Sequence, residues 1–128
     1  MKIFRSQIAL MTFIILMVLS SSAFADEKDV LKSLESLRGN VETGVSYLKY
    51  NELIANALVE LNIAERTIKN MAFIKEAKTC LKHYINARDG WKRKIDLAGD
   101  YAEQCEQYMQ QEWGEAARAL ERTYFALK

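Results

Sequence analysis

One apolar pattern, which runs without a break from Phe73 to Met109, restricts this chain more than any other feature. Apolar residues recur along it at steps of three or four, the spacing that places them on one side of an α-helix. The pattern comprises Phe73, Ala77, Cys80, Tyr84, Ala87, Trp91, Ile95, Ala98, Ala102, Cys105 and Met109. The chain contains no proline, and no useful stretch alternates apolar and polar residues as a strand would. We therefore expect an all-α fold.

Shorter apolar patterns upstream predict two more helices. The first ends near Gly39, where the sequence suits the end of one helix and the start of the next. A kink within one longer helix is the alternative. The second runs from about Val41 into the sixties, and Asn70 marks a turn after it. Residues 71–127 then form either one helix or a hairpin. The sequence thus predicts a small antiparallel bundle of three to four helices in a single domain, residues 26–128.

Residues 1–25 have the features of a secretory signal peptide. Two basic residues precede a 12-residue apolar run, Ile8–Leu19, and Ala23 and Ala25 supply the small side chains that signal peptidase requires. The run is shorter than the ~20 residues that cross a bilayer as a helix, which disfavours the alternative of an uncleaved anchor. We predict cleavage before Asp26 and a periplasmic or secreted protein, with no stable membrane insertion after cleavage.

The two cysteines, Cys80 and Cys105, present a conflict. In one continuous helix they would stand about 37 Å apart and could not pair. Cysteines in small exported domains usually do pair, so we predict a Cys80–Cys105 disulfide that joins two helices of a hairpin. Bridged residues lie equally far from the turn, so the turn must centre on residues 91–93, because a tight turn at Gly90 or Gly99 leaves a mismatch beyond a disulfide's reach. Free thiols and a bridge between two chains are the alternatives.

Charge and composition argue against several functions. Removal of the signal peptide leaves 16 of the 18 Lys and Arg residues against 17 Asp and Glu, a net charge of −1. A nucleic-acid-binding protein normally has a clear basic excess, so none is expected here. The only histidine is His83, and no nucleophile motif or glycine-rich phosphate loop accompanies it. We expect a non-enzymatic protein without a cofactor.

A metal site is a weaker possibility. Cys80 and His83 have C-x-x-H spacing on one helix face, and Cys105 would complete a site if the helices met there. Zinc sites usually offer more ligands at regular spacing, and a disulfide would consume both thiols. A periplasmic metal or haem carrier that uses these three residues is therefore an alternative function and not the main prediction.

Aromatic and basic residues predict the most suitable surface for a partner. Tyrosines near the start of the second helix and a basic cluster around a tryptophan are its components. The predicted partner surface consists of Tyr47, Tyr50, Arg88, Trp91, Lys92, Arg93 and Lys94. We predict an exported binding protein whose helical groove engages a protein or peptide. A small export-linked chaperone or inhibitor is an alternative, and a homodimer is possible.

Overall fold

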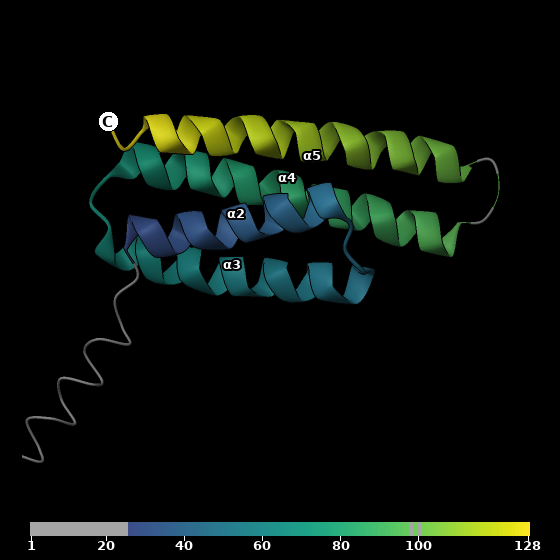
Figure 1. The fold of residues 1–128 in the computed structure, drawn as a ribbon, viewed down its shortest axis with the longest axis horizontal. Coiled ribbons are helices and arrows are strands. Elements are labelled where there is room, and N and C mark those ends of the chain that lie inside the picture. Colours follow the sequence, from purple (N-terminus) through teal and green to yellow (C-terminus); the bar gives the residue numbers. More distant parts are fainter. Residues whose placement is uncertain (1–25, 98, 100) are drawn as a thin grey trace, which may run out of the picture.

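The computed structural model describes residues 26–97, 99 and 101–128, which form four helices (Figure 1). They are α2 (Glu27–Thr43), α3 (Tyr47–Thr67), α4 (Met71–Asp96) and α5 (Tyr101–Phe125). Each helix runs antiparallel to the one before it. The described residues contain no strand, so the prediction of an all-α bundle of three to four helices is confirmed. The predicted signal peptide, residues 1–25, lies outside the described residues.

Side chains at three helix starts explain where those helices begin. The Asp26 carboxylate accepts a hydrogen bond from the Asp29 amide at 2.9 Å and so caps α2. The Ser46 hydroxyl accepts from the Lys49 amide at 3.1 Å and caps α3. Asn70 caps α4 in the same way, which confirms the turn predicted at this residue.

The first helix does not end at Gly39, so that prediction is wrong. Helix α2 continues to Thr43, and the Asn40 side chain donates to the Ser36 carbonyl inside the helix at 2.7 Å. The chain turns at Gly44, whose φ of 98° is a conformation that residues with a side chain rarely adopt. Gly44 followed by the cap residue Ser46 was therefore the true boundary signal.

The four helices share one hydrophobic core. Its largest fully buried side chains are Leu34, Leu37, Tyr50, Ile54, Phe73, Tyr84 and Leu120. Each such side chain contributes roughly 1.5–3 kcal/mol when it is removed from water. Helix α4 packs against the other three helices, whereas the backbones of α3 and α5 lie at opposite corners of the bundle. Only side chains connect α3 with α5 across the bundle.

The α4–α5 hairpin is longer than the α2–α3 pair and projects beyond it (Figure 1). The chain reverses between Asp96 and Tyr101, where Gly99 has a φ of 95°. We call the projecting part, made of the described residues from Trp91 to Tyr108, the hairpin tip. Trp91, at the base of the tip, packs against the core, and beyond it the side chains lie outside the core because only α4 and α5 are present there.

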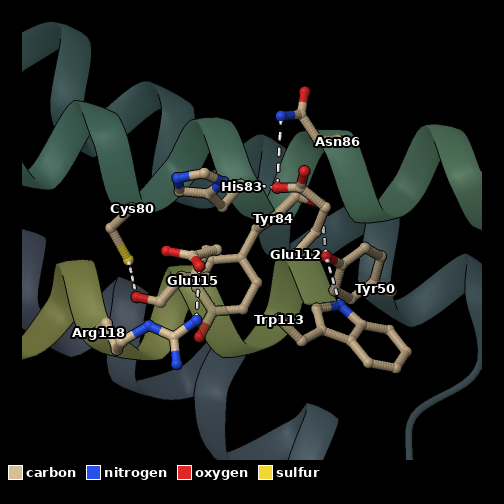
Figure 2. Close-up of polar contacts among 10 residues, drawn as sticks. Tyr50, Cys80, His83, Tyr84, Asn86, Glu112, Trp113, Glu115 and Arg118 are labelled. Carbon is tan, nitrogen blue, oxygen red and sulfur yellow. Dashed lines mark hydrogen bonds and ion pairs between the residues drawn. The ribbon is translucent and has the colours of Figure 1, made fainter. Parts of the chain in front are cut away.

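The predicted disulfide is wrong, because the cysteines are not near each other and both are free. Helix α4 passes through Gly90 and residues 91–93 without a break, so the turn lies near Gly99 and not at residues 91–93. Cys80 is therefore level with Ala116, whose carbonyl oxygen accepts its thiol at 3.3 Å (Figure 2). Cys105 lies at the hairpin tip beside Gly90. The single continuous helix over residues 71–127 is wrong as well.

Candidate functional site

Four aromatic rings from three helices meet where the hairpin leaves the bundle. Trp91 lies 5.4 Å from Tyr47, 5.6 Å from Tyr50 and 6.1 Å from Trp113, measured between ring centroids. Most of these pairs are edge-to-face, the arrangement that aromatic quadrupoles favour. The structure thus brings together three predicted site residues and adds Trp113. No local signal in the sequence pointed to Trp113 as a neighbour of these rings.

Tyr50 belongs to the core and not to an exposed surface. Its side chain is fully buried, and burial raises the pKa of its hydroxyl. The hydroxyl donates to the Tyr84 carbonyl oxygen at 2.5 Å and accepts from Trp113 Nε1 at 3.1 Å (Figure 2). Tyr50 therefore joins α3 to α4 and α5 across the diagonal of the bundle. Tyr47, Trp91 and Trp113 are half-buried, so solvent reaches these three members of the cluster.

The basic cluster is divided between different faces of the hairpin. Lys94 forms an ion pair with Glu106 at 2.6 Å, and the Arg93 guanidinium lies 5.6 Å from the centre of the Tyr108 ring. Arg88 is 3.7 Å from its neighbour Asp89. Lys92 is exposed and has no ion pair with any described residue. The four cations therefore do not form one continuous patch.

The Lys94–Glu106 pair holds α4 and α5 together at the hairpin tip. The hydrogen bond from Lys94, with a second one from Gln110, holds the pKa of the Glu106 carboxyl below its ordinary value. Both side chains are 39% exposed, so water and salt screen the pair strongly. The pair sets the alignment of the two helices more than it stabilises them.

A shallow apolar groove of about 290 Å³ lies between α4 and α5 at the hairpin tip. We call it the outer groove, and it is lined by Gly90, Arg93, Leu97, Tyr101, Gln104, Cys105 and Tyr108. Three large apolar side chains at the tip are exposed: Ile95 at 58%, Leu97 at 45% and Tyr101 at 61%. Leu97 and Tyr101 both line the outer groove, and exposed apolar residues grouped in this way are typical of an interaction surface. Sequence reasoning missed Leu97 and Tyr101, because it expected the chain to reverse before them.

His83 and the two cysteines point to separate environments. His83 Nδ1 lies 2.5 Å from Glu112 Oε2, which also accepts from the Asn86 amide at 3.5 Å (Figure 2). Cys80 is buried in the core, and burial raises the pKa of its thiol from 9.0 to about 12. Among the described residues, no group of three or more His, Cys, Asp or Glu side chains is placed to hold a metal ion. The arrangement therefore gives the carrier hypothesis no support.

A second opening lies between α2 and α5, with α4 as its floor. It has a volume of about 500 Å³ and is lined by Arg38, Val41, Glu42, Tyr84, Gln110, Trp113, Gly114 and Ala117. We call it the Tyr84 hollow. Arg38 Nε donates to Glu42 at 3.2 Å on its rim, and this bond raises the pKa of the guanidinium. The sequence did not predict this hollow, because it depends on how far apart two helices pack.

Comparisons of the chain with family models, curated proteins and solved structures find no match. Within the described part of the chain, no helix is both long enough and apolar enough to cross a membrane. The outer groove and the Tyr84 hollow are therefore the features from which a function is inferred.

Proposed function

We propose that this chain is an exported, non-enzymatic interaction protein that binds a protein or peptide segment with its hairpin tip. The observation that carries the proposal is the exposure of Leu97 and Tyr101 beside the outer groove, on two helices that project beyond the rest of the bundle. Burial of these side chains by a partner would recover the apolar surface that the bundle leaves in water.

The chemistry of the tip describes the partner. Leu97, Tyr101 and Tyr108 offer apolar contacts, and Arg93 and Lys92 add positive charge beside them. A segment that combines one or two large apolar side chains with a neighbouring carboxylate would satisfy both. Tyrosine and arginine are also among the residues that contribute most at protein interfaces. Export follows from the N-terminal features, which supply a short apolar run and an A-x-A site.

A photo-crosslinking experiment tests the proposal. A photoreactive phenylalanine analogue replaces Tyr101 in cells that express the full chain, and a second strain carries it at Val59, an exposed apolar residue of α3. We expect one discrete adduct from position 101 and none from position 59. An adduct of twice the chain's mass would identify a second copy as the partner. Equal, diffuse labelling from both positions would contradict the proposal.

Purified components complete the test. Leu97→Glu combined with Tyr101→Glu should weaken binding of the identified partner by at least about tenfold, because both changes place a charge in the interface. Val59→Glu is the matched control and should bind as the unmodified protein does. Export is measured separately by cell fractionation and N-terminal sequencing, with Asp26 expected as the first residue. A cytosolic protein that retains Met1 would refute the export part.

A further inference from the structure

The Tyr84 hollow contains a buried hydroxyl without a partner. The Tyr84 side chain is 1% exposed, yet its hydroxyl makes no hydrogen bond within the part of the chain that the structure describes. Every fully buried side-chain nitrogen or oxygen among the described residues does have a partner. The small uncovered part of Tyr84 must therefore include its hydroxyl, which opens into the hollow that the residue lines.

The hydroxyl is a hydrogen-bond donor at neutral pH. Burial of Tyr84 raises the pKa of its phenol, so the proton stays on the oxygen. Arg38 and Glu35 of α2 are the charged groups that act on it, together with Cys80 and Tyr50 from inside the core. Of these, Arg38 also lines the hollow, and only one of its five N–H groups bonds to Glu42. Two kinds of donor therefore converge on one opening.

The rest of the lining, apart from Glu42 and Gln110, is apolar or glycine. Trp113, Val41 and Ala117 supply apolar contact surface, and Gly114 leaves space beside them. A Cβ atom added at Gly114 would meet only Arg118 Nη2, at 3.9 Å. The volume of about 500 Å³ is within the usual range for small-ligand sites. Such a site accommodates a ligand that has an apolar body and an anionic end.

We propose that the Tyr84 hollow binds a small aromatic carboxylate. Its carboxylate accepts hydrogen bonds from Tyr84 Oη and the free N–H groups of Arg38, and its ring lies against Trp113 over Gly114. The Arg38 guanidinium also pairs with Glu42, so the carboxylate of the ligand competes for Arg38 with an exposed carboxylate and not with a buried one. The hollow lies between α2 and α5, away from the outer groove, so this site is independent of the proposed function. The same end group also occurs at the C-terminus of a peptide that ends in phenylalanine.

An NMR titration tests this site with three probes: 3-phenylpropionate, its amide, and N-acetyl-Ala-Ala-Phe with a free carboxylate. We expect the acid to shift the Gly114 amide and Trp113 indole signals at millimolar concentration, with the Gly99 amide unchanged. The amide should bind about tenfold more weakly, because it removes a charge-assisted hydrogen bond. Tighter binding of the peptide than of phenylpropionate would identify a peptide C-terminus as the ligand class, and the reverse order a free acid.

Two substitutions and a control complete the experiment. Tyr84→Phe removes only the hydroxyl and should weaken binding of phenylpropionate by about tenfold. Gly114→Leu fills the hollow and should abolish binding, whereas Gly39→Leu, on a helix position with nothing within 4 Å, should not. No shift at Gly114 and Trp113 with the unmodified protein, unchanged binding by Gly114→Leu, or equal binding of acid and amide would each overturn the proposal.

Discussion

Helices α4 and α5 run through both the four-helix body of the bundle and the hairpin tip, but different forces hold them in the two regions. In the body, α4 and α5 bury Phe73, Tyr84 and Leu120 against α2 and α3. At the tip beyond Trp91, the same helices have only each other, and an ion pair and a cation–aromatic contact align them. Gly90 lies close to the Tyr108 side chain at the base of the tip. The stability of the domain should therefore reside in the body, while the tip is free to carry exposed apolar residues for binding.

The two cysteines give the sharpest contrast between these regions. Burial raises the pKa of the Cys80 thiol to about 12, so it is almost entirely protonated and unreactive at neutral pH. Cys105 is half-buried at the tip. Iodoacetamide should therefore add one label to the native protein and two in denaturant, as measured by intact mass. If the denatured protein takes up no label without reductant, the two cysteines form a disulfide, and this result would contradict the fold.

Truncation of apolar side chains measures how the stability is divided. Phe73→Ala removes a fully buried ring from the body and should lower the free energy of unfolding by about 3–5 kcal/mol. Leu97→Ala at the tip should cost less than about 1 kcal/mol, because that side chain is 45% exposed. Urea denaturation of both variants provides the comparison. Similar losses would mean that the tip and the body are equally important for stability.

Two glycines inside helices test the close contact between α4 and α5 at the base of the tip. A Cβ atom at Gly90 would lie 2.7 Å from Tyr108 Cδ1 and 3.2 Å from Met109 Cγ, so in Gly90→Ala the Tyr108 side chain or the helix that carries it must shift. We expect a net loss of about 1 kcal/mol after the gain in helix propensity is included. Gly39→Ala meets nothing within 4 Å and should stabilise the protein by up to about 1 kcal/mol. Thermal unfolding would refute this interpretation if both variants gained stability.

The smallest expected effect concerns the Lys94–Glu106 pair. The pKa of Glu106 is lowered in the folded protein, so the pair contributes above the unfolded pKa of about 4.3 and its contribution is lost as the pH falls through the folded value. Both side chains are 39% exposed, which limits the contribution to a few tenths of a kcal/mol, about the least that an exposed pair provides. Lys94→Gln should flatten the pH dependence of stability below pH 5, whereas Lys82→Gln should not. If Lys94→Gln leaves the pH dependence of stability unchanged, the Lys94–Glu106 pair does not help to align α4 and α5 at the tip.

The prediction of the site failed where local and compartment arguments competed. A turn at Gly99 was considered, but the expectation that exported cysteines pair was given more weight. The turn was therefore predicted at residues 91–93, and the exposure of Leu97 and Tyr101 was not predicted. A turn near Gly99 does separate Cys80 from Cys105, as the distances along the two helices predicted.

The sequence by itself determined the class of fold and most of its core. The absence of proline and the apolar spacing of three and four required helices, because only that backbone puts such residues on one side. Cap residues such as Asn70 set a boundary through local hydrogen bonds. Only the tertiary structure established the contact between Tyr50 and Trp113, the open Tyr84 hollow and the projecting tip. These features depend on how far apart helices pack and how much longer one pair is than the other, which no local pattern encodes.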